Sequence, residues 1–334
     1  MKKKRREVYI FLDSPSRKGG IETFTLDLLE ALGKSGYNSV KIVYIHSDFF
    51  YFGKTSISLK KSWSIGLKRL FLHLYIKKDA LLIFHQPGHL KYCQRNTENV
   101  YLFVHNPSDL IKFRILNKLN RITLLCVGRH LLDHLRTFSN KKIVVIPPIQ
   151  KNEKKRLVSN FFRFVHIGRL SPEKCVDKSI YFIKELAQDF RELNFVLHIY
   201  GEGSEKYYLS ELIRNNSIEN LEIKLFEWID KSDIFRHFEN YDFYLSMSSI
   251  EGMPIALREA MISSLIPVVS DISAHREIIK SNENGYIVDN FFHSSNFVTE
   301  MRQLDLRRNM VVNGKKVLEN HHFDDFYLTI ENLF

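Results

Sequence analysis

Two glutamates separated by seven residues, Glu251 and Glu259, are the side chains whose spacing most suggests chemistry. Pro254 lies between them and is a favourable first residue of a helix, so a helix is expected to begin there. Glu251 would then lie in the loop before the helix, and Glu259 about one and a half turns inside it. The N–H groups of Met253 to Ala256 would be free at the helix start, and both carboxylates could bind ligand hydroxyls. An isolated pair of this kind is more often an exposed helix start that the helix dipole stabilises, so the neighbouring residues decide.

A second group of candidate residues begins at Gly168, which follows an apolar run and precedes a helical pattern. Ser171 suits the N-cap of that helix, and Pro172 suits its first position. Arg169 and Lys174 would flank the helix N-terminus, where two cations and exposed N–H groups could bind a pyrophosphate. The alternative is a pair of solvated basic side chains.

Two further turns carry glycines directly after apolar runs. Gly19 and Gly20 follow the first run, and glycine at a strand-to-helix junction lets the backbone approach a phosphate. Gly201 follows a later run, within the sequence Tyr-Gly-Glu-Gly-Ser. Each turn alone is a weak signal, because flexible turns and helix packing also use glycine.

All these residues lie at the ends of apolar runs that alternate with helical patterns. Runs that are apolar throughout are typical of strands in a parallel sheet covered on both faces. The alternation therefore predicts two doubly wound α/β domains. The expected strands are residues 7–13, 40–46, 80–85, 100–105, 122–127, 142–147, 162–167, 194–200, 221–226, 241–246 and 266–270. The expected helices are residues 22–32, 178–190, 205–215, 233–238, 255–263 and 275–280.

A domain boundary is expected after the first series of elements. Residues 150–160 are polar and charged and follow Pro147 and Pro148, which indicates a linker. It separates an N-terminal domain, residues 1–149, from a C-terminal domain, residues 161–334, whose last helix could pack back on the first domain. Two such domains in series imply a cleft between them, which is a usual place for a small ligand.

Basic residues are concentrated in the first half of the chain. Residues 1–150 hold 26 Lys and Arg against 10 Asp and Glu, while the remainder holds 23 against 28. The first domain is therefore expected to face an anionic surface or ligand. No apolar run is long enough to span a membrane, and the start of the chain lacks the apolar stretch of a signal peptide. Cys93, Cys126 and Cys175 have no metal-like spacing and suit reduced thiols in the cytoplasm.

The surroundings of the glutamate pair resemble family 4 of the retaining glycosyltransferases, which have the GT-B fold of two Rossmann-like domains. As in the signature of that family, Gly252 follows Glu251 and Ala260 follows Glu259. Further matches, in the order of the family, are Gly19-Gly20, Gly168-Arg169 with Lys174, and residues 200–203, 267–271, 277–279 and 284–288.

The resemblance implies a role for each matching residue. Arg169 and Lys174 are expected to neutralise the diphosphate of the donor. Glu259 is expected to hold the ribose hydroxyls, and Glu251 to contact the donor sugar. His105 resembles the active-site histidine of the family, although a capped strand end would also explain it. The other expected donor contacts are Gly19, Gly20, Gly168, Gly201, Gly252, Met253, Pro254 and Ile255.

The sequence departs from the family at a few positions. Cys175 stands where the family usually has glycine after its lysine. Met253, Pro254 and Ile255 replace an aromatic-x-Gly segment, which leaves the sugar preference open.

The reaction that the resemblance implies is a retaining transfer of a hexose-type sugar from a nucleotide sugar, with UDP favoured. Arg169, Lys174 and nearby N–H groups would stabilise the charge of the leaving diphosphate. The acceptor would attack on the front face, and the leaving phosphate would take its proton. No Asp-x-Asp segment follows an expected strand, so neither a metal ion nor another cofactor is expected.

Residues 54–78 suggest a contact with an anionic membrane surface, since they hold seven basic side chains and no acidic one. Leu67, Leu70, Phe71, Leu74 and Tyr75 recur at helical spacing, and basic amphipathic helices with aromatic residues bind such surfaces. The alternative is an ordinary helix with one buried face. The first domain of this fold usually holds the acceptor. The expected acceptor is therefore a growing lipid-linked or cell-surface glycan, and the expected location is the cytoplasmic face of the cell membrane.

Two other functions fit parts of the sequence. A sugar-nucleotide epimerase or a glycan phosphorylase could share the two-domain shape. A non-enzymatic binder of nucleic acid or anionic surfaces would use the basic half, but no nucleic-acid motif is visible. Such a binder would leave the glutamate pair and the Arg169–Lys174 pair unexplained, so no nucleic acid is expected as a partner.

Overall fold

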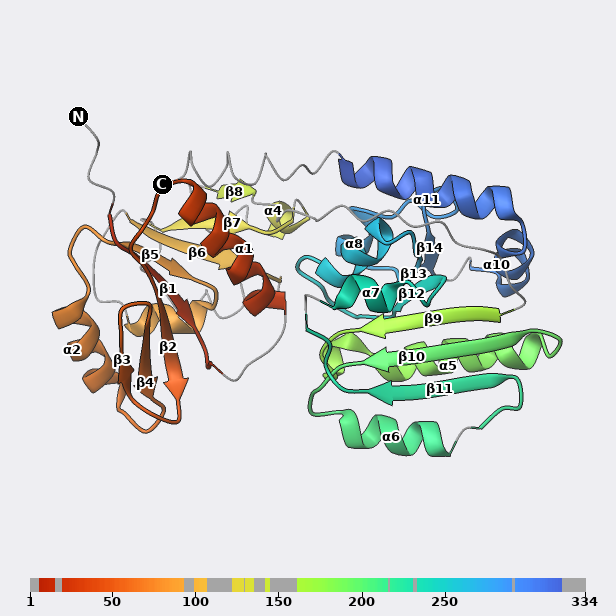
Figure 1. Cartoon of the computed structure of the whole chain (residues 1–334), viewed down its shortest axis with the longest axis horizontal. Helices are drawn as coiled ribbons and strands as arrows, with labels where there is room; N and C mark the ends of the chain where they lie inside the picture. The colour runs from red at the N-terminus through yellow and green to blue at the C-terminus, as the bar shows by residue number, and fades with distance from the viewer. Residues whose placement is uncertain are drawn as a thin grey trace. The chain divides into compact units, whose positions relative to one another are not determined.

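The computed structural model describes residues 6–15, 20–92, 99–106, 122–128, 130–134, 142–144, 161–215, 217–230, 233–289 and 292–319. The chain divides into two compact units, residues 1–148 with 323–334 and residues 149–322. Each unit contains one β-sheet (Figure 1). The expected linker, residues 150–160, and the expected last helix lie outside the described residues.

The first unit is built on an eight-stranded, mostly parallel sheet. Its strands are β1 (Val8–Leu12), β2 (Val40–Ser47), β3 (Tyr51–Phe52), β4 (Ser56–Lys60), β5 (Leu81–Phe84), β6 (Val100–Val104), β7 (Thr123–Cys126) and β8 (Lys142–Val144). They follow the order β3-β4-β2-β1-β5-β6-β7-β8, and only β3 runs antiparallel to its neighbour. Every residue of β1, β5 and β6 is buried, as expected for strands covered on both faces. The six strands expected in this half are present, whereas the β3–β4 hairpin was not expected.

Helices of the first unit include α1 (Gly20–Lys34), α2 (Ile65–Tyr75), the 3₁₀ helix η1 (Pro87–Tyr92) and α4 (Leu131–His134). Ser64 caps α2, since its hydroxyl accepts a hydrogen bond from the N–H of Leu67 at 3.2 Å. An ordinary domain helix buries its apolar face, but the leucines of the amphipathic pattern of α2 are exposed. Leu70 and Leu74 are 56% and 69% exposed, whereas Lys68 is 1% exposed and donates to the Ile45 carbonyl at 2.8 Å. One of the seven basic residues in the segment expected to face a membrane surface, Lys68, is therefore buried, contrary to that prediction.

The second unit contains a six-stranded, fully parallel sheet. Its strands are β9 (Phe161–Ile167), β10 (Asn194–Tyr200), β11 (Leu221–Phe226), β12 (Phe243–Ser246), β13 (Ile266–Ser270) and β14 (Tyr286–Val288). Their order, β11-β10-β9-β12-β13-β14, is that of a Rossmann sheet, in which the direction of winding reverses beside the first strand. The prediction of two doubly wound α/β domains is confirmed.

Helices connect the strands of the second unit. They are the 3₁₀ turn η3 (Pro172–Lys174), α5 (Val176–Asp189), α6 (Lys206–Arg214), α7 (Ile234–Phe238), α8 (Ile255–Ile262), α9 (Ser273–Arg276), α10 (Ser294–Met301) and α11 (Leu304–Glu319). The helix expected at residues 275–280 is instead the single turn α9. α8 corresponds to the helix expected at residues 255–263, whereas α11 was not expected. The two helices pack against each other.

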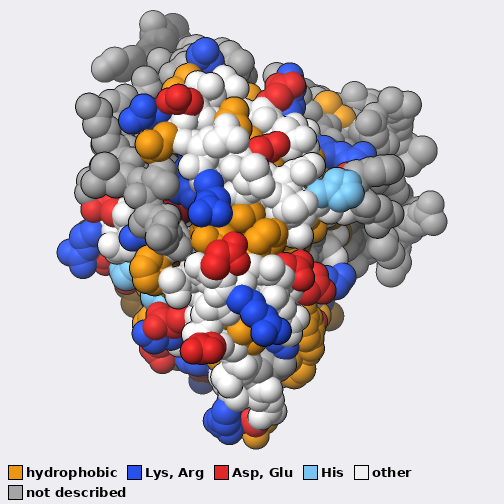
Figure 2. Space-filling model, turned by 90° about the vertical axis from the view of Figure 1, so that its right-hand side faces the viewer, with side chains coloured by type: hydrophobic (Ala, Val, Ile, Leu, Met, Phe, Trp, Pro, Cys, Tyr) orange, Lys and Arg blue, Asp and Glu red, His pale blue; other side chains and the backbone are white. Residues whose placement is uncertain are grey.

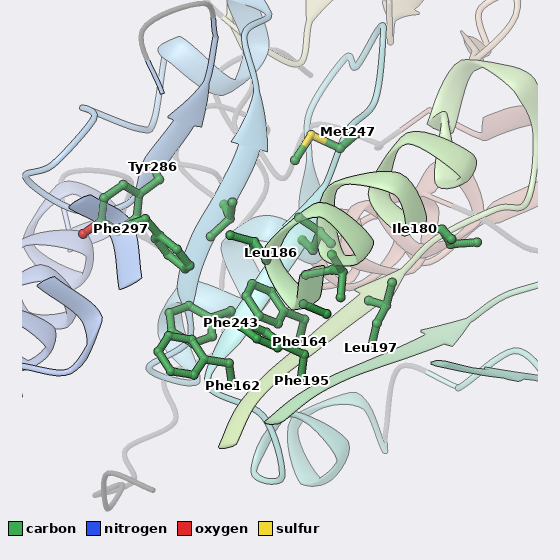
Figure 3. Close-up of a cluster of buried hydrophobic side chains, with 14 of the residues drawn as sticks. Phe162, Phe164, Ile180, Leu186, Phe195, Leu197, Phe243, Met247, Tyr286 and Phe297 are labelled. Carbon is green, nitrogen blue, oxygen red and sulfur yellow. The ribbon is translucent and has the colours of Figure 1, made fainter. Parts of the chain in front are cut away.

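Phenylalanines form much of the core beneath the sheet of the second unit (Figure 3). The rings of Phe164 and Phe243 stack with centroids 4.7 Å apart, and Phe162 stacks on Phe243 at 5.7 Å. Phe297 from α10 closes the cluster edge-on at 5.4 Å from Phe243. These large buried rings fix β9 and β12 relative to each other, and both strands lead into the candidate site.

The structure describes part of the surface and two of the three cysteines. Figure 2 views the side on which the second unit is drawn, and basic and acidic side chains are mixed on the described part of this face. Cys126 is buried and Cys175 is partly exposed, and within the described residues no disulfide joins them. Cys93 lies outside those residues. None of the described helices is both long and apolar enough to cross a membrane.

Candidate functional site

The carboxyl ends of β9 and β12 adjoin where the winding of the sheet reverses, and open α/β sheets bind ligands at such a point. The loop after β9 carries Arg169 and Lys174, and the loop after β12 carries Glu251. The two loops are also joined directly. The N–H and hydroxyl groups of Ser249 donate to the Glu173 carbonyl at 2.9 and 3.1 Å.

The loop after β9 differs from the predicted helix start. Pro172 opens the 3₁₀ turn η3, and α5 begins only at Val176. Ser171 precedes the turn, but its hydroxyl donates to Glu173 Oε1 at 2.6 Å and caps no N–H group. Cys175 joins the turn to α5 with φ 45° and ψ 49°, the left-handed conformation that glycine adopts at least cost. The cysteine therefore keeps the backbone shape that a glycine would give.

Lys174 and Glu251 form the closest contact between the two loops. Lys174 Nζ lies 2.6 Å from Glu251 Oε1, and the hydroxyl of Ser248 donates to the same oxygen at 2.8 Å. The side chains of Lys174 and Glu251 are only 23% and 11% exposed. Burial raises the pKa of Glu251, but the charge and hydrogen bond of Lys174, together with the hydrogen bond from Ser248, bring it below the ordinary 4.5. Glu251 is therefore an ionised carboxylate at neutral pH.

A network of buried hydrogen bonds fixes the loop that carries Glu251. The hydroxyl of Ser270 donates to the Ser248 carbonyl at 2.5 Å, and His275 Nδ1 donates to the Ser270 carbonyl at 2.8 Å. His166 on β9 likewise donates from Nδ1 to the Leu245 carbonyl at 3.0 Å. Sequence reasoning missed these residues, because single serines and histidines at strand ends show no distinctive spacing.

The two histidines of this network are neutral. Burial lowers the pKa of His166 to about 4 and also lowers the pKa of His275. Since Nδ1 donates in each ring, Nε2 is an acceptor. Both Nε2 atoms are buried and have no hydrogen-bond partner within the part of the chain that the structure describes. His166 Nε2 also lies 3.3 Å from where a Cβ on Gly168 would stand, which favours glycine there.

α8 starts at Ile255, directly after the proline that was expected to begin the helix. Pro254 is its N-cap, with φ −78° and ψ 79°, which is the central conformation of an inverse γ-turn. In this turn the N–H of Ile255 donates to the Met253 carbonyl at 2.9 Å, so it is not free, contrary to prediction. Glu259 lies within the helix as predicted and is 7% exposed. Its neighbour Arg258 is 3% exposed, and burial lowers its pKa to about 10.

Two glycines after β10 are required by close packing on the loop after β9. A Cβ at Gly201 would lie 2.0 Å from the Gly168 carbonyl oxygen. A Cβ at Gly203 would lie 2.1 Å from the Leu170 carbonyl oxygen. The N–H of Leu170 in turn donates to the Glu202 carbonyl at 2.9 Å. Gly201 therefore shapes the Arg169–Lys174 loop through backbone contact.

Of the candidates in the first unit, His105 is described best. It follows β6, and its Nε2 lies 2.8 Å from Nδ1 of His85. Burial lowers the pKa of His105 to about 3, and burial with the neighbouring histidines also lowers that of His85, so both are neutral. Gly20 is the first residue of α1, and Gly19 lies outside the described residues.

The second unit thus places an ionised carboxylate, a lysine and a buried helical glutamate around one switch point. Lys174 can bind an anion and Glu251 can accept hydrogen bonds from hydroxyls. Gly168 and Arg169 belong to the same loop as Lys174, and Gly201 belongs to the turn after β10 that packs on this loop. The roles that the resemblance implies for these residues, and for His105, stay predictions.

Comparison with known proteins identifies relatives for most of the chain. The family described as Glycosyl transferases group 1 matches residues 149–317. Poly(ribitol-phosphate) alpha-N-acetylglucosaminyltransferase of Staphylococcus aureus (strain COL) is 28% identical over 297 residues, covering 80% of this chain and 58% of the relative. The UDP-N-acetylglucosamine–peptide N-acetylglucosaminyltransferase GtfA subunit of Streptococcus agalactiae is 34% identical over 128 residues, covering 38% and 24%. The chain therefore spans less than two thirds of either relative.

A solved structure matches the chain along nearly its whole length. The structure of Anabaena Alr3699/HepE in complex with UDP and glucose superposes with a TM-score of 0.72. It covers 98% of this chain and 99% of its own, at 14% sequence identity. At this identity the likeness concerns the fold, and the expected GT-B architecture is confirmed.

Proposed function

This chain belongs to the family of glycosyl transferases group 1, and we propose that it is a retaining family 4 enzyme that transfers a hexose-type sugar from a nucleotide sugar to a growing glycan. One observation carries the proposal. Lys174 and Glu251, 77 positions apart, meet 2.6 Å from each other at the switch point of the Rossmann sheet. A cation beside an ionised carboxylate matches a donor that joins an anionic diphosphate to a hydroxyl-rich sugar.

The proposed mechanism depends on charge stabilisation. As the bond between the sugar and the diphosphate breaks, negative charge develops on the leaving phosphate. Lys174 and Arg169 would stabilise this charge in the transition state. Lys174 is already held by Glu251 and is largely buried, so little conformational freedom is lost when a phosphate joins it.

The carboxylates would position the donor. Glu251 would accept hydrogen bonds from the sugar, and Glu259 from the ribose. The acceptor oxygen then bonds to the anomeric carbon on the face from which the diphosphate leaves, and the leaving phosphate takes the acceptor proton. This sequence retains the anomeric configuration. Since two basic side chains supply the positive charge, we propose that the transfer needs no metal ion.

The donor and acceptor are proposed from the relatives. Both named relatives are N-acetylglucosaminyltransferases, and the name of one contains UDP-N-acetylglucosamine. These names favour a UDP-sugar as donor. The name of the S. aureus relative contains poly(ribitol phosphate), a polymer whose phosphate groups make it anionic. An anionic or lipid-linked glycan would suit the basic first half of this chain.

We also propose that the first unit binds the cytoplasmic face of the cell membrane through an apolar patch, defined as residues 49–52 and the outer face of α2. Its exposed side chains are Phe49, Phe50, Tyr51, Phe52, Ile65, Leu67, Leu70, Leu74 and Tyr75, each at least 40% exposed. The two parts are continuous, since the rings of Phe52 and Tyr75 lie 4.9 Å apart and those of Phe50 and Phe71 lie 5.4 Å apart. Lysines 60, 61, 77 and 78 adjoin the patch in sequence. Aromatic and aliphatic groups with basic neighbours suit the interface of an anionic bilayer.

A donor panel tests the proposed activity. The purified chain would be incubated with UDP-, GDP- and ADP-sugars and an oligosaccharide acceptor, and nucleotide release would be measured. We expect release from a UDP-sugar, and proton NMR of the product should show the anomer of the donor. Release from none of the donors would contradict the transferase assignment, and an inverted product would contradict retention.

A further inference from the structure

We propose that Asp13, His46 and His89 in the first unit form a binding site for a divalent transition-metal ion, of which zinc fits best. One ligand atom from each residue lies within 4.8 Å of the other two. Neither the donor mechanism nor the family membership uses these residues. The inference therefore stands independently of the proposed function.

Three different elements bring the ligands together. Asp13 directly follows β1, His46 lies near the end of the neighbouring β2, and His89 lies on η1. His46 Nδ1 is 2.7 Å and His89 Nε2 is 3.5 Å from the same oxygen, Asp13 Oδ1. The N–H of His46 also donates to the Asp13 carbonyl at 2.7 Å, which fixes the two backbones.

The spacing is close to that of a coordination sphere. Ligands about 2.0–2.1 Å from a tetrahedral zinc ion stand roughly 3.3 Å from one another. The distance from His89 to Asp13 is already near this value, and the distance from His46 to Asp13 has to lengthen by well under 1 Å. An ion would replace the hydrogen bonds to Asp13 by bonds of two imidazole nitrogens and a carboxylate oxygen to one centre.

The surroundings supply support and access. Coordinating histidines usually bond a second group through their other ring nitrogen. The hydroxyl of Tyr92 lies 3.4 Å from His46 Nε2, and its oxygen can accept a hydrogen bond from the Nε2–H group when Nδ1 binds a metal. His89 is 3% exposed, whereas His46 is 40% exposed, so one side of the site is rigid and the other is open to solvent.

The donor set selects the ion. Two imidazoles with one carboxylate suit zinc and related ions, whereas Mg²⁺ and Ca²⁺ prefer several oxygen ligands. Two basic groups lie close by, since the ammonium groups of Lys68 and Lys91 are 5.6 and 5.1 Å from the centroid of the Tyr92 ring. Their positive charges further disfavour Mg²⁺ and Ca²⁺, which oxygen ligands hold mainly by electrostatic attraction. The bound ion would fasten β1, β2 and η1 together and takes no part in the transfer step.

Metal titration of the full chain, free of any affinity tag, tests the site. After removal of metal, the protein would be titrated with Zn²⁺ by calorimetry and with Co²⁺ by visible absorption. We expect one equivalent of Zn²⁺ per chain at low micromolar concentration, the d–d bands of Co²⁺ bound by nitrogen and oxygen, and no heat with Mg²⁺. His46→Gln should abolish the binding, and Tyr92→Phe should weaken it about tenfold through loss of the supporting hydroxyl. His73→Gln, an exposed histidine on α2, is the matched control and should bind as the wild type does.

Loss of zinc binding in the His46→Gln variant can be distinguished from loss of folding. His46 is the most exposed ligand, and circular dichroism would verify that its variant is folded. Zinc should raise the melting temperature of the wild type and leave that of His46→Gln unchanged. Wild-type protein that takes up no Zn²⁺ under these conditions would overturn the proposal and leave a hydrogen-bonded cluster only. Equal binding by wild type and folded His46→Gln would overturn it too. None of these readouts depends on sugar transfer.

Discussion

A buried carboxylate normally stays ionised only where cations and hydrogen-bond donors surround it, and Glu251 meets this condition through Lys174 and Ser248. The pKa of Glu251 is below 4.5 in the folded chain. Ionisation therefore stabilises the fold above the pKa of the unfolded chain, and this stabilisation is lost as the pH falls through the lower folded value. The pair is thus a structural element as well as a proposed donor contact.

We predict that Glu251→Gln lowers the free energy of unfolding by about 2 kcal/mol at pH 7, because Lys174 loses its counter-charge in a largely buried place. The difference from wild type should shrink as the pH falls through the lowered pKa of Glu251, because the wild-type glutamate is then itself protonated. Urea unfolding at pH 7 and at a series of acidic pH values measures it. Glu185→Gln, at an exposed position of α5, is the control with no expected effect. A difference that does not change with pH would contradict the electrostatic explanation.

Individual site residues could be predicted from the sequence, but their partners could not. The spacing of Glu251 and Glu259 placed one in a loop and the other on a helix, as the structure has them. The contact between Lys174 and Glu251 joins positions 77 residues apart, and it follows from the order of strands in the sheet. The inverse γ-turn at Pro254 depends on a backbone angle that a proline alone does not fix.

At the scale of elements, the loop after β9 depends on its packing against the glycine turn after β10. We predict that Gly201→Ala lowers the free energy of unfolding by about 3 kcal/mol, since its Cβ would overlap the Gly168 carbonyl. Gly33→Ala is the matched control, because nothing lies within 4 Å of a Cβ at this position of α1. Alanine there should stabilise the chain slightly. Chemical denaturation measures both, and equal stabilities of the two variants would contradict the packing argument.

The apolar patch makes a prediction about membrane binding. The double variant Leu70→Gln and Leu74→Gln should bind anionic vesicles about tenfold more weakly, because two exposed leucines can no longer enter the interface. Flotation with phosphatidylglycerol-containing vesicles measures the binding. Leu26→Gln, at a position of α1 that is 58% exposed, is the control. Equal flotation of all variants, or equal binding to neutral and anionic vesicles, would contradict the proposed surface.

Most strands could be predicted because they are largely apolar runs, whereas the short β3–β4 hairpin could not. β3 has two residues, both exposed, and so shows no periodicity. The orientation of α2 could not be predicted either. An amphipathic pattern identifies two faces, but which face is covered depends on neighbours distant in sequence, here the Ile45 carbonyl that holds Lys68. The sequence therefore predicts the helix but not that Lys68 is buried.

At the scale of the whole molecule, each unit has a sheet of its own, and the strand order of each sheet reverses beside its first strand. The basic excess belongs to the first half, and the predicted donor residues other than Gly19, Gly20 and His105 belong to the second. The proposed separation of acceptor and donor binding rests on this distribution of residues. The two residues proposed to stabilise charge, Arg169 and Lys174, lie within one loop of one unit, where they can be tested by single substitutions.

The most direct test of the proposed function compares the turnover of the preferred UDP-sugar by wild type, Arg169→Ala and Lys174→Ala. Lys178→Ala, an exposed lysine on the adjoining α5, is the control. We predict that kcat falls by at least about 100-fold in each of the two site variants and stays near the wild-type value in the control, because only the site residues stabilise the leaving diphosphate. Near-normal turnover by both Arg169→Ala and Lys174→Ala would contradict the account.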